Sequence, residues 1–200
     1  MSCPHRSFYA RSTAIVAKEL LGKILVRTIP ITNCESQRLA GLIIETEAYG
    51  YNDDAASHAY KGLTPKNKAM FGEVGRAYIY FTYGNHFCVN VSAHSEEFKA
   101  GAVLIRALQP LEGINVMKRY RKNNDYLSLT SGPGKITQAL NITKLLNECD
   151  MTNPDSDLHI EFGTAPQAII AKKRIGITRA VDKKWRFVLV DDKHQQKKGL

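Results

Sequence analysis

Two runs of strand-forming residues, separated by a short turn, constrain the fold of this chain more than any other feature. The first run covers residues 78–83 and the second covers residues 86–91, and both are rich in aromatic and β-branched side chains. Gly84 and Asn85 stand between them. Because glycine supplies the positive φ that the twist of paired strands demands, this spacing is typical of a tight primed turn. The sequence therefore predicts a β-hairpin.

The register and the tip of this hairpin decide which of its side chains can act together. A two-residue turn sets Tyr83 opposite His86. It also sets Tyr80 opposite Val89, so Tyr80 and Asn90 fall on different faces unless the hairpin contains a bulge or twists strongly. The Tyr83 ring adjoins the turn and is expected either to project from the ribbon or to fold back onto neighbouring loops. In a basic protein, a projecting ring is suited to wedge between base pairs.

Further patterns predict short elements along the rest of the chain. Thr64-Pro65 can start a brief helix that carries Lys66 and Lys68. The remaining expected elements are helices over 13–21, 110–121 and about 136–141, strands over 23–29, 42–49, 101–107 and 185–190, and loops over 32–38 and 122–128. With no internal repeat or long linker, we expect one α+β domain over residues 1–200, a curved and mostly antiparallel sheet with a protruding β-hairpin, surrounded by helices.

The charge balance predicts a polyanionic partner. The chain carries 28 Lys and Arg against 19 Asp and Glu, a formal net charge of +9. Dense basic clusters at residues 118–122 and 172–174 add to the field of the protein. Such a field attracts nucleic acid first of all, although many basic proteins bind none.

Cysteine usage and hydropathy favour an intracellular protein. The four cysteines, Cys3, Cys34, Cys88 and Cys149, are scattered and form no C-x-x-C pair, which argues against a zinc ribbon and for reduced thiols. No apolar run approaches the roughly 18 residues of a membrane span, and the N-terminus lacks the apolar region of a signal peptide. We expect no membrane partner, and a location in the cytoplasm or nucleoid of a bacterium or the nucleus of a eukaryote.

Two carboxylates close the strand expected over residues 42–49. Side chains alternate along an extended chain, so Glu45, Glu47 and Tyr49 share one face. A solvated edge strand is the ordinary explanation, because glutamates are mostly exposed. Two acids beside an aromatic ring at the end of an apolar strand still need an explanation, and a hydrolase needs a carboxylate of this kind.

Two further motifs are weak when taken alone. Asp53-Asp54 and His58 offer metal-binding side chains, but a catalytic metal normally takes about three protein ligands and no second histidine is near, so no metal or other cofactor is expected. The segment 131–135 is not a Walker loop. Free amides at a helix start, with Gly134 and Lys135, can still hold a phosphate of a DNA backbone, and a simple turn is the alternative.

Taken together, the spaced motifs resemble one family, that of the alkyladenine, or 3-methyladenine, DNA glycosylases. The resemblance runs in order from about Leu21 to Ile177. It is carried by Glu45-Thr46-Glu47-Ala48-Tyr49, His58, Thr64-Pro65-Lys66-Asn67, Met70-Phe71-Gly72, Tyr78-Ile79-Tyr80-Phe81-Thr82-Tyr83-Gly84, Cys88-Val89-Asn90-Val91, Leu104-Ile105-Arg106-Ala107-Leu108, Pro110-Leu111-Glu112-Gly113 and Ser131-Gly132-Pro133-Gly134-Lys135.

The resemblance implies an enzyme that flips an alkylated or deaminated purine out of duplex DNA and hydrolyses its N-glycosidic bond. Glu47 matches the family's catalytic base and Arg106 a polar residue near the attacking water. The residues that match those enclosing the flipped base, including the one that discourages guanine, are Tyr49, His58, Tyr80 and Asn90.

At the DNA surface the resemblance assigns fewer roles. Tyr83 matches the intercalating side chain, and Lys66 stands where the family usually carries arginine. The hairpin tip and the segment beyond Trp185 also depart from the family pattern. No lysine is placed by a motif as a Schiff-base nucleophile, so no lyase step is expected, and the enzyme is expected to act as a monomer. The main alternative is a non-catalytic binder of distorted DNA, and Glu47 argues against it because a carboxylate near phosphates is unfavourable without a catalytic purpose.

Overall fold

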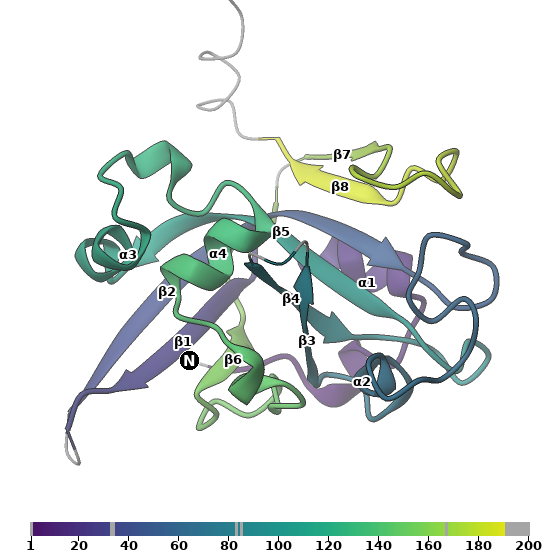
Figure 1. Cartoon of the computed structure of the whole chain (residues 1–200), viewed down its shortest axis with the longest axis horizontal. Helices are drawn as coiled ribbons and strands as arrows, with labels where there is room; N and C mark the ends of the chain where they lie inside the picture. Colours follow the sequence, from purple (N-terminus) through teal and green to yellow (C-terminus); the bar gives the residue numbers. More distant parts are fainter. Residues whose placement is uncertain (1, 33–34, 83, 85, 167, 191–200) are drawn as a thin grey trace, which may run out of the picture.

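A single curled antiparallel sheet organises the chain in the computed structural model, which describes residues 2–32, 35–82, 84, 86–166 and 168–190. Its strands within these residues are β1 (Ile24–Pro30), β2 (Ser36–Tyr49), β3 (Ala77–Thr82), β4 (His86–Ser92), β5 (Ala102–Glu112), β6 (Leu158–Glu161), β7 (Ile169–Lys172) and β8 (Arg186–Leu189). The order is β3-β4-β5-β2-β1-β6, and β8 pairs with both β2 and β7 (Figure 1). The predicted α+β class with a curved antiparallel sheet is confirmed.

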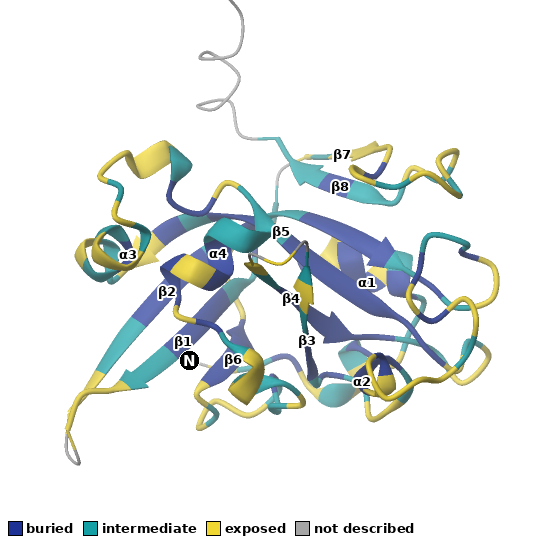
Figure 2. Ribbon diagram, viewed as in Figure 1, coloured by how far each residue is buried: buried dark blue, intermediate teal, exposed yellow. Residues whose placement is uncertain are grey.

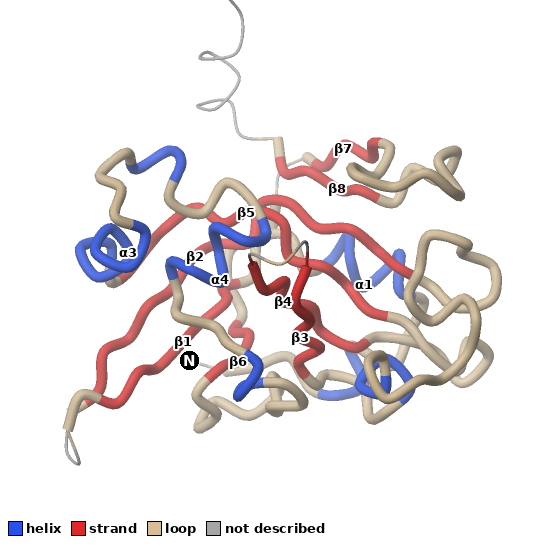
Figure 3. The backbone as a smooth tube through the Cα atoms, viewed as in Figure 1, coloured by secondary structure: helices blue, strands red, loops and turns tan. Residues whose placement is uncertain are grey.

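Short helices surround the sheet, as Figure 3 shows in blue. They are α1 (Thr13–Glu19), α2 (Lys68–Phe71), α3 (Ile114–Arg121) and α4 (Pro133–Ala139), with single 3₁₀ turns at Arg6–Phe8, Tyr126–Ser128 and Lys144–Leu146. Helix α1 packs on β2 and β5, and α4 packs on β4 and β5. The buried middle of the sheet, dark blue in Figure 2, supplies most of the core. No helix in the described part of the chain is long and apolar enough to cross a membrane.

Strand β2 pairs with three other strands. Its first half lies beside β1, from Ser36 to Leu42. Its second half lies beside β8, at residues 45–47, while β5 follows its other edge. The register with β5 shifts around Glu45, which marks a β-bulge. A strand covered on both edges at its acidic end is not the solvated edge strand that glutamates would ordinarily indicate.

Several predicted boundaries are wrong by a few residues, among them the start of the helix expected from residue 110. Strand β5 continues through Pro110, which pairs with Gly41 at an irregular point of the ladder, and helix α3 begins only after Gly113. Gly113 adopts φ of 73°, a conformation that ends the strand and turns the chain into the helix. The segment 32–38 is also shorter as a loop than predicted, because β2 begins at Ser36. The brief helix α2 contains Lys68 but not Lys66.

The β3–β4 hairpin forms as predicted, with a different register. Thr82 pairs with His86, and Tyr80 pairs with Cys88. The loop therefore spans residues 83–85 rather than two residues, and the predicted pairs of Tyr83 with His86 and Tyr80 with Val89 are wrong. The added loop residue shifts the second strand by one position and returns Asn90 to the face of Tyr80 without a bulge. Tyr83 lies outside the described residues, and projection of the tip stays a prediction.

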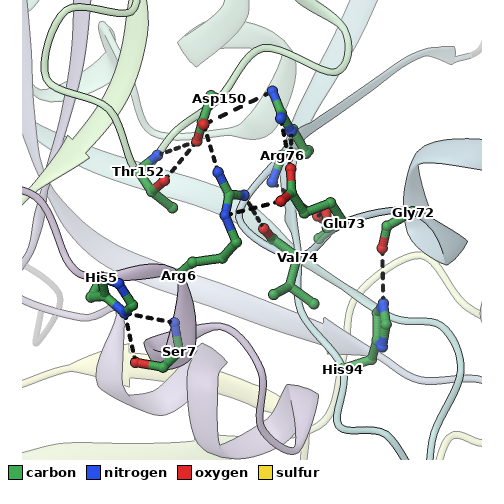
Figure 4. Close-up of polar contacts among 11 residues, drawn as sticks. His5, Arg6, Ser7, Gly72, Glu73, Val74, Arg76, His94, Asp150 and Thr152 are labelled. Atoms are coloured by element: carbon green, nitrogen blue, oxygen red, sulfur yellow. Dashed lines mark hydrogen bonds and ion pairs between the residues drawn. The ribbon is translucent and has the colours of Figure 1, made fainter.

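An ion-pair network fastens the N-terminal segment to residues at the base of the β3–β4 hairpin, at the end away from its loop (Figure 4). Arg6 Nη2 lies 2.6 Å from Asp150 Oδ2, and Arg6 Nε lies 3.2 Å from Glu73 Oε1. Glu73 also pairs with Arg76 at 2.6 Å. Burial alone raises the pKa of Asp150, but hydrogen bonds from Thr152 and Arg6 outweigh it and hold that pKa below its ordinary value. This network serves stability rather than the site described next.

Candidate active site

A cavity of about 410 Å³ opens between the β3–β4 hairpin, strand β5 and the segment before β8. This volume suits a small-molecule ring system. The face of the hairpin that carries Tyr80 and Asn90 forms one wall. Residues that line the cavity include Tyr49, His58, Tyr78, Tyr80, Cys88, Asn90, Leu104, Arg106, Gly134, Ile175, Gly176 and Ile177.

Aromatic side chains make the cavity suited to a flat ligand. The His58 and Tyr80 rings lie 4.7 Å apart, edge to face, and Tyr78 and Tyr80 lie 5.3 Å apart. The Tyr78 hydroxyl and His58 Nδ1 are 2.9 Å apart. Burial lowers the pKa of His58, so this imidazole is uncharged near neutral pH. Burial also raises the pKa of Tyr78 to about 12, which keeps its hydroxyl neutral. The rings of the cavity are therefore uncharged, and the positive charge of Arg106 at its wall is paired with Glu45 and Glu47.

Asn90 is held rigidly at the side of this cavity. Its side chain is buried, and its Nδ2 donates to the Tyr78 carbonyl at 2.9 Å. Because the two residues are cross-strand partners, the hairpin register itself holds the amide beside the backbone carbonyl of Tyr78. The structure thus brings together the four residues expected to enclose a base, which are Tyr49, His58, Tyr80 and Asn90.

Glu47 lies directly behind the cavity wall and is fully buried. Its Oε2 accepts from the Tyr49 hydroxyl at 2.8 Å and from Arg106 Nη1 at 3.2 Å. Its Oε1 accepts from the backbone N–H of Ile175 at 2.8 Å. All three donors belong to residues that line the cavity. An ionised carboxylate has about four acceptor positions and donates nothing, so three donors match the ionised form and leave one acceptor position unused by them.

Tyr49 serves this carboxylate as a neutral donor. Burial, followed by the charge of Glu47, raises the pKa of Tyr49 far above its ordinary value. The phenol therefore keeps its proton over the whole physiological range and continues to donate to Glu47. A side chain expected only to enclose a base is at the same time a hydrogen-bond partner of the predicted catalytic group.

Arg106 joins the two acids of β2. Its Nε lies 2.9 Å from Glu45 Oε1, and its Nη1 lies 3.2 Å from Glu47 Oε2. Glu45 in turn pairs with Arg186 of β8 at 3.2 Å. Two carboxylates thus face two guanidinium groups, all largely buried, and the charges balance. Glu45 directs its carboxylate at two arginines rather than at the cavity.

The C-terminal hairpin of β7 and β8 contributes residues that sequence reasoning missed. The sequence pattern assigns the basic cluster 172–174 to a general positive field, yet Arg174 is buried and its Nη1 lies 2.6 Å from Asp54 Oδ2. The Asp54 carboxylate, a weak metal-binding candidate by sequence, is an ion-pair partner of this arginine. Ile175 supplies a donor to Glu47 through its backbone, which no side-chain pattern can signal.

The residues expected to contact a DNA backbone lie around the cavity rather than in it, apart from Gly134. Lys66 and Lys68 are exposed, and Lys135 Nζ lies 2.9 Å from Ser131 Oγ. Gly134 lies against His86, and a Cβ built on Gly134 would come within 2.8 Å of His86 Cβ. The structure therefore places α4 in close contact with the hairpin. It leaves the DNA-contact role of these residues a prediction.

Comparison with known proteins identifies the family of this chain. The model of the family described as "Methylpurine-DNA glycosylase (MPG)" matches residues 7–193. Two bacterial relatives carry the name "Putative 3-methyladenine DNA glycosylase". The protein from Carboxydothermus hydrogenoformans is 45% identical over 96% of this chain and 98% of its own length. That from Prosthecochloris aestuarii is 42% identical over 96% of this chain and 90% of its own length.

An archaeal protein of the same printed name, from Methanoculleus marisnigri, is 44% identical over 92% of this chain and 93% of its own length. The match therefore holds across distant sources and includes the hairpin, the acidic end of β2 and the C-terminal segment that meet at the cavity. This chain belongs to the methylpurine-DNA glycosylase family of DNA repair enzymes.

Proposed function

We propose that this DNA glycosylase flips an alkylated or deaminated purine out of duplex DNA and hydrolyses its N-glycosidic bond with Glu47 as the catalytic base. One observation carries the proposal: a fully buried carboxylate is held by three donors directly behind an aromatic cavity. The cavity receives the purine, and its wall brings the sugar toward Glu47. Flipping costs a few kcal/mol, and the cost is smaller for a damaged base.

In the hydrolytic step, Glu47 takes a proton from a water molecule as that water attacks the anomeric carbon of the sugar. The bond from that carbon to the purine nitrogen breaks, and its electron pair leaves with the base. A purine made cationic by alkylation departs as a neutral base, whereas a neutral deaminated purine must also take up a proton. The acceptor position of Glu47 that none of the three donors uses is proposed to receive the attacking water. Arg106 holds the same carboxylate in place and is expected to lie near the water as well. General-base help of this kind is typically worth about 10² to 10⁴-fold in rate.

The cavity favours a purine made cationic by alkylation. A positive charge is attracted to the faces of aromatic rings such as those of Tyr49 and Tyr80. His58 is uncharged because burial lowers its pKa, so it does not repel such a base. A cationic purine is already a good leaving group, and one carboxylate then suffices. We expect Asn90, whose amide is fixed by Tyr78, to discourage normal guanine, as the family resemblance implies.

The remaining roles concern DNA. We propose that Tyr83 fills the gap left by the flipped nucleotide, and that Lys66, Lys68, Gly134 and Lys135 contact the phosphate backbone. No lysine is among the described residues that line the cavity, which supports a monofunctional enzyme without a lyase step. We further propose that the protein acts as a monomer inside the cell.

Release of damaged bases tests this function. The protein is incubated with duplex oligonucleotides that contain hypoxanthine, ethenoadenine or 7-methylguanine, and free base and alkali-labile sites are measured. Release without borohydride-trapped protein is the expected result. Trapping of a covalent adduct would contradict the monofunctional proposal. Lesion binding without release from any of the three duplexes would instead favour a non-catalytic binder of distorted DNA.

A further inference from the structure

A fully buried ion pair lies beside the cavity and is not used in the mechanism above. Arg174 donates from Nη1 to Asp54 Oδ2 and from Nη2 to Asp54 Oδ1, both at 2.6 Å. Neither side chain is exposed to solvent. Two parallel hydrogen bonds of this kind fix both the distance and the angle between the partners. The residues are far apart in the sequence, so the pair joins distant parts of the chain.

Each partner also binds backbone groups of the segments around it. Asp54 accepts from the N–H of Gly50 at 3.0 Å and from that of Ala56 at 3.3 Å. Arg174 donates to the carbonyl of Ala48 at 2.9 Å. Its guanidinium carbon also lies 4.8 Å from the centre of the Tyr49 ring. The pair thus connects the end of β2, the loop after β2 and the segment between β7 and β8.

All three connected segments carry residues of the candidate active site. The end of β2 carries Glu47 and Tyr49. The loop that contains Asp54 also carries His58, which lines the cavity. Ile175, the residue next to Arg174, donates its N–H to Glu47 at 2.8 Å. One buried contact therefore sets the positions of the base, of an aromatic wall and of a hydrogen-bond donor to the base.

A stabilising role alone does not account for this pair. Removing two charges from water is expensive, and well-packed apolar residues often serve stability equally well. Apolar side chains at positions 54 and 174 would leave the N–H groups of Gly50 and Ala56 and the carbonyl of Ala48 without these partners. The ion pair is suited to orient three polar segments at once.

We propose that Arg174 and Asp54 are positioning residues for the glycosylase reaction, which hold the Ile175 N–H and the Tyr49 ring against Glu47. The inference rests on the proposed function of Glu47. Neither residue needs to touch the substrate. Their effect is on the rate of bond cleavage through the geometry and hydrogen bonding of the carboxylate.

The test compares Arg174→Lys and Asp54→Asn with the wild-type protein on a hypoxanthine duplex. Lysine keeps the charge but loses the two-pronged contact, and asparagine keeps the size of the side chain. The single-turnover rate at saturating enzyme is expected to fall by about 10²-fold, as for a misplaced reacting group, while the Kd for the duplex changes little. The double variant should lose no more than either single variant, because both changes break the same contact.

The pH dependence of the rate separates positioning from loss of stability. Glu47 accepts hydrogen bonds from Tyr49 of its own strand, Arg106 of β5 and the Ile175 N–H between β7 and β8. The other charged groups around it are Glu45 of its own strand, Arg174, and Arg186 of β8, which bonds to Glu45. Weakening of the Ile175 and Tyr49 contacts makes the ionised carboxylate harder to form. The acidic limb of the pH–rate profile should therefore move to higher pH in both variants.

Glu161→Gln is the matched control, because Glu161 is a buried partner of Arg38 with two hydrogen bonds of 3.0 and 2.9 Å on edge strand β6, away from the cavity. It should lower the melting temperature but leave the single-turnover rate and its pH profile unchanged. Should both pair variants fail to fold, Gly176→Ala perturbs the same segment at an open position with φ of 74° and should still lower the rate.

The outcomes separate this inference from the proposed function. Release of hypoxanthine by the wild-type protein with rates for Arg174→Lys and Asp54→Asn equal to that of Glu161→Gln would overturn the positioning role alone. An unchanged rate in Gly176→Ala, with the pair variants unfolded, would overturn it too. Failure of the wild-type protein to release any damaged base would refute the proposed function and this inference with it.

Discussion

Replacing Glu47 by glutamine should abolish base release while the protein still binds damaged DNA. Glutamine has nearly the same shape, but its amide cannot take a proton from water. The rate should therefore fall by the full value of a general base, about 10² to 10⁴-fold. Binding should persist, because Glu47 is not among the residues that line the cavity. Loss of its negative charge also raises the net positive charge near the DNA phosphates by one.

The same substitution should lower stability by an amount that follows from the contacts. All three groups around the carboxylate are donors, so the amide –NH₂ of glutamine must face at least one of them. A buried donor left unpaired costs about 1–3 kcal/mol. Loss of one of two carboxylates also leaves Arg106 and Arg186 with Glu45 alone. For a chain of this size the melting temperature should fall by about 2–4 °C for each kcal/mol lost.

The assay is a single-turnover excision measurement on a hypoxanthine duplex, combined with a binding titration and a thermal melt of the same protein samples. An undamaged duplex with adenine in place of hypoxanthine serves as the substrate control. A Glu47→Gln protein that releases base at a near-normal rate would refute the role of Glu47. A variant that melts well above the wild-type protein would refute the account of the three donors, because it would mean that the buried carboxylate is poorly stabilised in the native state.

Three further predictions concern other parts of the molecule. Tyr83→Ser should weaken binding to lesion duplex more than binding to single-stranded DNA in titrations of both, and equal losses would remove the wedge role. Gly134→Ala should lower the stability by roughly 1–3 kcal/mol and reduce excision, because the added Cβ would lie 2.8 Å from His86 Cβ. The loss should appear as a lower melting temperature, and an unchanged melting temperature would mean that α4 shifts freely. Asp150→Asn should cost roughly 1 kcal/mol above pH 4, measured by denaturant unfolding. Because the folded-state pKa of Asp150 is lowered, the stability it contributes is present above its unfolded pKa and is lost as the pH falls through the folded value, so a pH-independent difference would contradict the ion-pair account.

Sequence patterns predicted the features that depend on residues close together in the chain, such as which side chains of a strand share a face. Alternation along the strand placed Glu45, Glu47 and Tyr49 together, and in the structure both acids reach Arg106 while the Tyr49 hydroxyl reaches Glu47. The hairpin was found for the same reason, because aromatic and β-branched residues on either side of a glycine form strands. Its register was wrong because turn length cannot be read from the Gly84-Asn85 pair alone. One added loop residue decides whether Asn90 faces the cavity or the opposite side.

Contacts between distant segments could not be predicted in this way. Arg174 follows two lysines in a run of three basic residues, and nothing in the sequence of that run shows that Arg174 is buried while the lysines are exposed. Its partner Asp54 is separated from it by 120 positions. The Ile175 donor is a backbone group, so its side chain carries no signal at all. The resemblance to a known family covered the side chains expected to enclose the base, whereas the contacts that hold those side chains in place became visible only in three dimensions.

The C-terminal strand explains why two carboxylates can be buried at the end of β2. Strand β8 pairs with residues 45–47, where β1 no longer follows β2, and Arg186 reaches Glu45 from it. Without β8, one edge of β2 would be open at both acids and Glu45 would keep only Arg106. Water would then compete for the Glu47 contacts and weaken every electrostatic interaction around it. The acidic end of β2 and strands β7 and β8 therefore form one structural unit, although 141 positions separate Glu45 from Arg186 in the sequence.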